Sequence, residues 1–231
     1  MILSSLMATM AVGSAFTTPV RFPQGSQAIE KLAETVRLSK RYGVVCGVIL
    51  PQPINDPLKY TLSDAQVMKE VIGATAGEVS LLTSASADDQ KPTKAKILAE
   101  IDRLSAIATP RDTFWFYFSG HGTQWNDDGK SYVLPYDFKP GVKDSLISIS
   151  DIRSRLKEKC KARAVVVVLD SCHSGSDKSV PTSGGLENAF GALQGVNTVA
   201  SSRVDQVSTE LPLLKHGTFT FFFVRGMAGD A

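Results

Sequence analysis

Two apolar segments of strand length, each ending abruptly in a polar motif, most constrain the fold of this chain. Thr113–Ser119 contains five consecutive aromatic residues, and Ala164–Leu169 contains four consecutive valines. Uninterrupted β-branched or aromatic runs of this length are typical of strands that are buried on both faces of a sheet. The fold must therefore bury both faces of these strands. It must also expose the motifs at their ends, Ser119-Gly120-His121-Gly122 and Asp170-Ser171-Cys172-His173-Ser174-Gly175.

Segments with helical periodicity alternate with strand-like segments along the rest of the chain. Apolar residues recur at intervals of three and four after four capping or start positions, Ser26, Ser63, Thr93 and Ser148. Four further segments have the length and composition of strands: Val44–Leu50, Val79–Thr83, Val196–Ser201 and Thr218–Val224. Such alternation implies βαβ units with helices on both faces of a mostly parallel sheet. We therefore expect an α/β fold, a three-layer αβα sandwich whose central sheet has about six strands.

The composition is that of a soluble globular protein and argues against two kinds of partner. Hydrophobic residues make up 43% of the 231 residues, which suits one domain with a sizeable core. The net charge of +2 is too balanced for a nucleic-acid-binding protein. Met1–Ala15 is apolar, but it is shorter than the roughly 20 residues that span a bilayer. We expect no nucleic-acid partner and no membrane span.

The N-terminal region stands apart from the expected domain. Met1–Ala15 ends in small residues like those before a secretory cleavage site, yet no Lys or Arg precedes Arg21. Residues 1–25 are therefore either an N-terminal arm or a degenerate export signal, and residues 26–231 form the expected domain. We expect the arm, and hence a cytoplasmic protein, with export as the alternative.

A histidine and a cysteine follow the two most apolar strands. His121 lies between two glycines, and Cys172 follows it by 51 positions. If both strands are central and parallel, their carboxyl ends lie at one edge of the sheet, where α/β folds bind ligands. A thiolate is a nucleophile, and a nearby imidazole activates the thiol or protonates the leaving amine. We therefore predict His121 and Cys172 as a catalytic pair, with the amides of Gly122 and Cys172 as oxyanion donors.

Each of these residues also has an alternative interpretation. A cysteine at a strand end is often a small apolar core residue, and a histidine in a glycine-flanked turn is often structural. His173 is a second imidazole, but adjacent side chains diverge, so we assign it an orienting or packing role. His216 opens the last expected strand, and we assign it a structural role. The three cysteines are unequally spaced and support neither a disulfide framework nor a Cys-x-x-Cys metal site.

The sequences of the two motifs resemble those of the caspase-like cysteine peptidases, and among them those of the metacaspases and bacterial orthocaspases. A histidine about 50 residues before the nucleophilic cysteine is the caspase arrangement. Further similarity lies in Tyr132–Asp137, Ala200–Ser202 and His216–Thr220, and the resemblance covers roughly residues 40 to 227. It implies a caspase-like fold and a cysteine endopeptidase that acts through a thioester, with no cofactor in the chemistry.

The resemblance also implies protein or peptide substrates with Arg or Lys before the scissile bond. Asp170 matches the family's pocket acid, and Asp64 matches a second acid on the helix after the first strand. Ser119 matches a third pocket-lining position. Carboxylates around a long cation form charge-assisted hydrogen bonds. From the residues alone, Asp64 has a second interpretation as an ordinary acid at a helix N-terminus, stabilised by the helix dipole.

The resemblance has two further implications, for regulation. Many metacaspases need calcium, and Asp137, Asp144 and Asp151 fall near the corresponding region without completing a set of six to eight oxygen ligands. We therefore assign no metal ligand and expect calcium, if needed, only as an activator. The Gly- and Ser-rich segment 176–195 resembles loops that are cut during self-activation of a zymogen, and Lys178 is its basic residue.

Two other functions fit the same residues. The first is a non-catalytic caspase-like module that binds partners or peptides, although such modules have typically lost the Cys or the His that this chain retains. The second is a related cysteine endopeptidase or transpeptidase with another residue preference. Alkylation of Cys172 near neutral pH tests the first alternative, because an unactivated thiol reacts slowly there. A peptide library profile tests the second.

Overall fold

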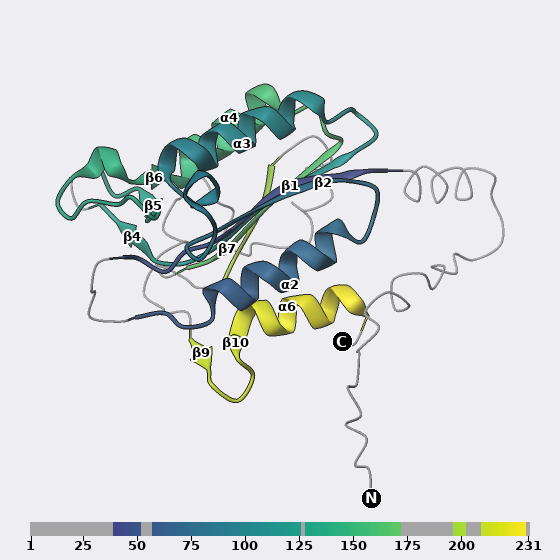
Figure 1. Cartoon of the computed structure of the whole chain (residues 1–231). Coiled ribbons are helices and arrows are strands. Elements are labelled where there is room, and N and C mark those ends of the chain that lie inside the picture. The colour runs from purple at the N-terminus through teal and green to yellow at the C-terminus, as the bar shows by residue number, and fades with distance from the viewer. Residues whose placement is uncertain (1–38, 52–56, 126–127, 172–195, 202–208, 230–231) are drawn as a thin grey trace, which may run out of the picture.

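A twisted central sheet lies between two pairs of helices in the computed structural model, which describes residues 39–51, 57–125, 128–171, 196–201 and 209–229 (Figure 1). The described helices are α2 (Thr61–Gly73), α3 (Lys94–Ile107), α4 (Ile149–Lys159) and α6 (Thr218–Ala228), with short 3₁₀ turns at Asp88–Gln90 and Lys143–Ser145. Helices α3 and α4 cover one face of the sheet, and α2 and α6 cover the other. The architecture is therefore a three-layer αβα sandwich.

The described strands of the central sheet are all parallel. They are β1 (Arg41–Gly47), β2 (Gly77–Thr83), β3 (Thr113–Ser119), β7 (Ala164–Asp170) and β8 (Val196–Ala200). Their order across the sheet is β2-β1-β3-β7-β8. The aromatic strand β3 is therefore central, with β1 on one side and the valine strand β7 on the other.

Side chains of the central strands alternate between the two helical layers. Phe116 and Phe118 of β3 and Val167 of β7 pack toward α3 and α4. Tyr117 and Val168 pack toward α2 and α6 instead. All five side chains are fully buried. Burial on both faces explains why these strands are apolar without alternation, and the parity of a residue decides which helical layer its side chain faces.

Two small antiparallel sheets flank the carboxyl edge of the central sheet. The first contains β4 (Gly122–Gln124), β5 (Ser131–Val133) and β6 (Ile147–Ser148). The second is a hairpin of β9 (Glu210–Leu211) and β10 (His216–Gly217), which leads directly into α6. The hairpin lies beside the N-terminal end of α2 (Figure 1). This position brings segments that are 150 residues apart in the chain into contact.

The expected α/β sandwich with a mostly parallel sheet is confirmed, but the described sheet has five strands and not six. Helices begin close to the three predicted positions within the described residues, and Thr93 caps α3 by accepting a hydrogen bond from the Lys96 amide. The helix predicted after Ser26 lies outside the described residues. In the part of the chain that the structure describes, no helix is long and apolar enough to cross a membrane.

The strand predicted at Thr218–Val224 is wrong, because this segment forms the first turns of helix α6. Its aromatic and β-branched residues favour a strand by composition, and a short apolar run does not reveal its own period. In the structure, Phe219 and Phe223 are one helical turn apart, and their rings stack with centroids 5.4 Å apart. Both rings pack against the layer formed with α2, so tertiary packing selects the helix.

Candidate functional site

The two motifs meet at the carboxyl edge of the sheet because β3 and β7 are adjacent and parallel. Ser119 ends β3 and lies opposite Asp170, the last residue of β7. Both positions have the parity of Tyr117, so both side chains face the layer of α2 and α6. Both residues are buried. The expectation that the two strand ends are neighbours is therefore confirmed.

The first turn of α2 reaches this edge because β1 ends in a glycine. A Cβ at Gly47 would lie 2.6 Å from the carbonyl oxygen of Thr61 and 2.8 Å from the Cβ of Ala65. Such distances are far below van der Waals contact, so a larger residue would push α2 away from the sheet. The close approach delivers Asp64, in the first turn of α2, to the side chain of Ser119.

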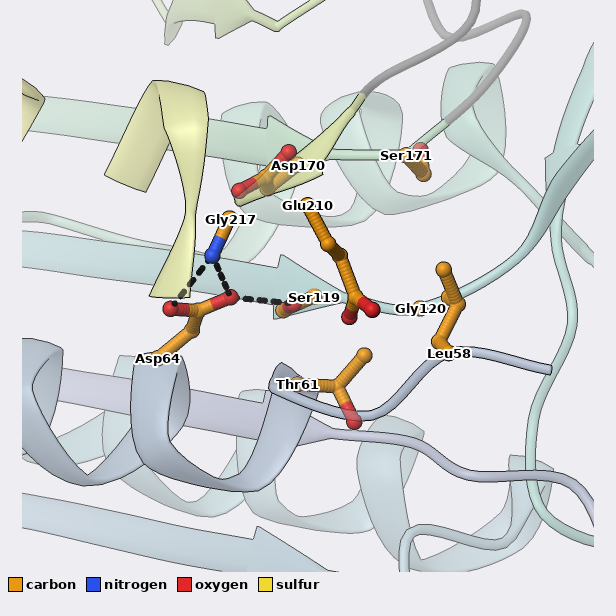
Figure 2. Close-up of a pocket in the computed structure, with 9 residues that line it drawn as sticks. All are labelled: Leu58, Thr61, Asp64, Ser119, Gly120, Asp170, Ser171, Glu210 and Gly217. Atoms are coloured by element: carbon orange, nitrogen blue, oxygen red, sulfur yellow. Dashed lines mark hydrogen bonds between the residues drawn. The ribbon is translucent and has the colours of Figure 1, made fainter. Parts of the chain in front are cut away.

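Asp64 is a buried acid held by the strand that precedes α6. It is 1% exposed, and the Gly217 amide donates to both of its carboxylate oxygens at 3.1 Å (Figure 2). Its Oδ1 lies 2.8 Å from His216 Nδ1, and its Oδ2 lies 3.4 Å from Ser119 Oγ. A helix-terminal acid stabilised only by the dipole would face solvent, whereas Asp64 is enclosed and bonded to a distant segment.

Asp170 lies on the other side of Gly217 and is held from α6. Thr220 Oγ1 donates to Asp170 Oδ2 at 2.6 Å. A Cβ at Gly217 would lie 2.8 Å from this Oδ2 and 3.0 Å from Asp64 Oδ2. Only the absence of a side chain at Gly217 therefore allows the two carboxylates to stand so close to the backbone.

The electrostatics of the site follow from two buried acids at close quarters. The pKa of Asp64 is raised to about 6, mainly by burial and also by the charge of Asp170. Hydrogen bonds from His216 and Gly217 act in the opposite direction and lower the pKa. A cation placed between the two carboxylates would relieve their repulsion and favour the ionised form of Asp64.

A narrow pocket opens between these acids (Figure 2). Its lining residues come from five separate segments and are Leu58, Thr61, Asp64, Ser119, Gly120, Asp170, Ser171, Glu210 and Gly217. The cavity measures about 20 Å³, which admits about one water-sized group. A longer side chain therefore enters only if the wall moves outward. Three of the lining residues are acidic: Asp64, Asp170 and Glu210.

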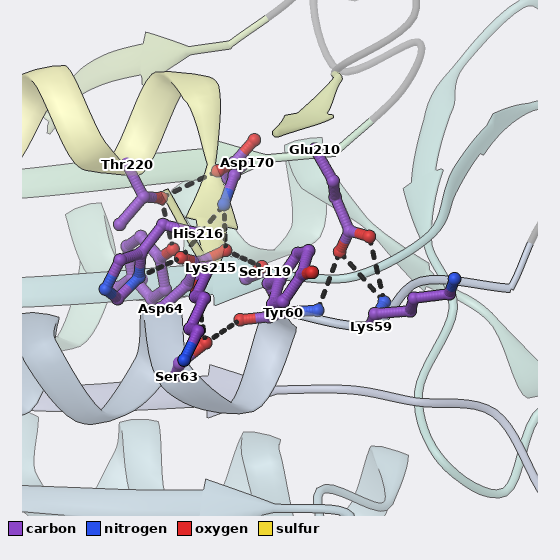
Figure 3. Close-up of polar contacts among 12 residues, drawn as sticks. Lys59, Tyr60, Ser63, Asp64, Ser119, Asp170, Glu210, Lys215, His216 and Thr220 are labelled. Carbon is purple, nitrogen blue, oxygen red and sulfur yellow. Dashed lines mark hydrogen bonds and ion pairs between the residues drawn. The ribbon is translucent and has the colours of Figure 1, made fainter. Parts of the chain in front are cut away.

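Glu210 is a lining residue that the sequence analysis missed. Its carboxylate accepts hydrogen bonds from the amides of Lys59 and Tyr60 at 2.8 to 3.0 Å, so it caps the chain just before α2 (Figure 3). It lies in the two-residue strand β9, 40 positions after Asp170. No periodicity or local motif distinguishes Glu210 from a surface acid, and only the docking of the hairpin brings it to the pocket.

His121 and Gly122 lie just past the pocket, at the start of the β4–β6 sheet. His121 is half-buried, and its carbonyl accepts a hydrogen bond from the Leu134 amide at 3.0 Å. Gly122 pairs with Val133 of β5. Hydrogen-bonded and non-bonded pairs alternate in an antiparallel ladder, so the bond at His121 directs the Gly122 N–H away from β5. This orientation suits the predicted role of Gly122 as an oxyanion donor.

The described structure thus brings Asp64, Ser119 and Asp170 into one pocket, and Ser119 precedes His121 by two residues in the sequence. Cys172 comes two residues after Asp170 and lies outside the described residues, as do His173 and Lys178. The predicted contact between His121 and Cys172 therefore stays a prediction. His216, assigned a structural role from the sequence, lies at the pocket acid Asp64.

The acids considered for calcium do not gather into a site. Asp137 accepts a hydrogen bond from the Lys94 amide at 2.8 Å, at the start of α3. The backbone carbonyl of Asp144 accepts from Lys94 Nζ. Among the described residues, no group of three or more His, Cys, Asp or Glu side chains is arranged to hold a metal ion. Calcium activation therefore stays a prediction, and no step below depends on it.

Comparisons with known proteins point to one family. A family model described as the caspase domain matches residues 46–227. Metacaspase-9 of Arabidopsis thaliana is 29% identical over 72% of this chain and 54% of its own length. Metacaspase-1A of Aspergillus fumigatus is 30% identical over 87% of this chain and 54% of its own length. The chain thus spans about half the length of these curated relatives.

A solved structure agrees with the fold. The crystal structure of a Geobacter sulfurreducens protein, a structural-genomics target, matches with a TM-score of 0.55 at 17% sequence identity. The match covers 81% of this chain and 80% of the other chain. At this level of identity the likeness concerns the fold alone, and it agrees with the sandwich described above.

Proposed function

Because the chain belongs to the caspase-domain family, we propose that it is a cysteine endopeptidase that cleaves peptide bonds after Arg or Lys. One observation carries the specificity. Asp64 and Asp170 are buried around a pocket at the carboxyl edge of the sheet. In the sequence, Ser119 at the end of β3 precedes His121 by two residues, and Asp170 at the end of β7 precedes Cys172 by two. A pocket of this charge accepts a cationic side chain and repels an acidic one.

The proposed reaction uses Cys172 and His121. The Cys172 thiolate forms a bond to the scissile carbonyl carbon, and the negative charge moves onto the carbonyl oxygen, where the amides of Gly122 and Cys172 stabilise it. The C–N bond then breaks, and the leaving amine takes a proton from His121. A water molecule, deprotonated by His121, attacks the resulting thioester and releases the carboxylic acid and the thiol.

The acidic pocket explains the choice of side chain in this proposal. Asp64 and Asp170 would each form a charge-assisted hydrogen bond to a guanidinium or ammonium group, and Ser119 lines the same pocket. Glu210 adds a third negative charge at the pocket wall. A substrate aspartate would meet three like charges in a buried site, which is strongly unfavourable.

Hydrolysis of matched fluorogenic peptides tests the proposal. The peptides differ only in the residue before the fluorophore, which is Arg, Lys, Asp or citrulline, the uncharged analogue of Arg. We expect cleavage after Arg and Lys and about 100-fold lower kcat/KM for citrulline. Each peptide is assayed with calcium and with a chelator, which tests whether calcium activates the peptidase. Cleavage after Asp alone would contradict the acidic pocket, and no cleavage under any condition would favour a binding module.

The raised pKa of Asp64 predicts a specific pH dependence. Asp64 is charged above its pKa of about 6 and neutral below it. We expect the ratio of kcat/KM for the Arg peptide to that for the citrulline peptide to fall about tenfold between pH 7.5 and 5. Taking the ratio cancels the titration of Cys172 and His121, which affects both peptides equally. A ratio that stays constant over this range would show that Asp64 does not bind the substrate cation in its ionised form.

A further inference from the structure

A buried chain of hydroxyl groups leads from the centre of the sheet to the pocket. Tyr117 OH lies 2.6 Å from Thr220 Oγ1. Thr220 Oγ1 in turn lies 2.6 Å from Asp170 Oδ2 (Figure 3). Tyr117 and Thr220 are both fully buried. Their positions are far apart in the chain, since one lies on β3 and the other in the first turn of α6. Neither residue has a role in the reaction proposed above.

The direction of these hydrogen bonds follows from the groups themselves. Burial, with the nearby charges of Asp170 and Asp64, raises the pKa of Tyr117 well above its usual value, so the phenol keeps its proton. An ionised Asp170 can only accept, so Thr220 donates its single proton to it. The Thr220 oxygen then accepts from Tyr117. Two O–H groups in series thus point toward the carboxylate of Asp170, and each bond strengthens the other.

The first turn of α6 holds both pocket acids at once. The Gly217 amide, at the N-cap of α6, donates to Asp64, and the Thr220 hydroxyl donates to Asp170. The N-terminal end of a helix also carries a partial positive charge, which favours nearby anions. The spacing between the two carboxylates is therefore set by the position of one helix turn and not by the strands alone.

We propose that Thr220 is a positioning residue for substrate specificity, which fixes the carboxylate of Asp170 in the pocket and is itself fixed by Tyr117. This inference rests on the function proposed above. Thr220 does not line the pocket and acts only through Asp170. A carboxylate held by a short hydrogen bond keeps one orientation, and an oriented carboxylate can form a bidentate pair with guanidinium. Arg, with its planar fork, depends on this orientation more than Lys does.

Thr220→Val tests the inference because valine has nearly the same shape and lacks the hydroxyl. We expect KM for the Arg peptide to rise about tenfold, with kcat changed less than twofold and a smaller rise in KM for the Lys peptide. Thr220→Ser restores the hydroxyl and should restore most of the affinity. Tyr117→Phe, which leaves Thr220 in place, should shift KM in the same direction by a smaller factor.

The control is Thr218→Val in the same helix turn. The Thr218 hydroxyl contacts only the exposed Thr209 hydroxyl among the described hydrogen bonds, at 3.3 Å, so this variant should behave as wild type. The rate of Cys172 alkylation by iodoacetamide reports on the catalytic pair without using the pocket. It should be the same in wild type and in Thr220→Val.

The outcomes separate this inference from the proposed function. If wild type cleaves after Arg and Lys but Thr220→Val has an unchanged KM and an unchanged ratio of Arg to Lys cleavage, the positioning role is wrong and the function stands. If Thr220→Val loses kcat and alkylation together, the hydroxyl has a general structural role, which also overturns the inference. If Thr220→Val does not fold, Tyr117→Phe tests the inference instead. An unchanged KM in that variant would show that the hydrogen bonds from Tyr117 through Thr220 to Asp170 do not position the carboxylate. Absence of Arg and Lys cleavage in wild type rejects the function itself.

Discussion

Replacement of Cys172 by alanine should lower kcat/KM for the Arg and Lys peptides by roughly 10⁴-fold or more, because it removes the nucleophile that forms the thioester. His121→Ala should cause a loss of similar size, since the leaving amine then has no proton donor. The double variant should be no worse than either single variant, because the two side chains act as a unit. Steady-state kinetics at saturating and limiting peptide concentrations measures each of these losses.

The other two cysteines provide the matched controls. Burial raises the pKa of the Cys46 thiol far above its usual range and also raises the pKa of the half-buried Cys160. Neither thiol is therefore a good nucleophile at neutral pH. Cys160→Ser should leave the activity unchanged, and iodoacetamide should label Cys172 first. Full activity in Cys172→Ala would disprove the thioester mechanism.

Asp170→Asn should lower kcat/KM for the Arg peptide by about 100-fold and leave that for the citrulline peptide within about threefold. Asparagine has the size of aspartate, and its carbonyl oxygen can still accept the hydrogen bond from Thr220, so the variant mainly removes charge. The same substitution at Asp64 would change hydrogen bonding as well as charge. There the Gly217 amide donates to both oxygens, and an amide NH₂ would face a donor.

The peptide comparison distinguishes a lost charge from a damaged fold. A misfolded pocket would impair cleavage after Arg and after citrulline alike, whereas a missing charge impairs only the former. Asp89→Asn, at an exposed acid in the 3₁₀ turn far from the pocket in sequence, serves as a neutralisation control. If Asp170→Asn cleaves the Arg peptide as well as wild type does, Asp170 is not part of the specificity pocket.

The strand assignments show where sequence patterns suffice. The segments Thr113–Ser119 and Ala164–Leu169 appear as the adjacent central strands β3 and β7, since runs of this composition have no stable place outside a doubly covered sheet. The helix starts at Thr93 and Ser148 are marked by side-chain caps, which act locally. The strand prediction for Thr218–Val224 was wrong because its aromatic residues fit the period of a strand or of a helix. The contacts with α2 that select the helix come from a distant part of the chain.

The candidate site divides in the same way. The rule that α/β sheets bind ligands at their carboxyl edges pointed to the two motifs after β3 and β7, and so to His121. The resemblance to the caspase-like peptidases then singled out Ser119 and Asp170, which end these strands. No sequence pattern identifies Glu210 or Thr220 as part of the site. Their roles arise from hydrogen bonds to segments about 150 and 50 residues away, at Tyr60 and Asp170.

The sequence alone therefore determined the layers of the sandwich, the two central strands and the edge at which chemistry is expected. These features depend on local composition and on the general geometry of parallel sheets. Only the tertiary structure decided that α6 is a helix, that its first turn holds Asp64 and Asp170 together, and that Glu210 joins them. These contacts depend on how closely particular backbones approach, as at Gly217, where a single Cβ would collide with both carboxylates. Distances of that kind are set by the packing of whole elements, which no local pattern in the chain encodes.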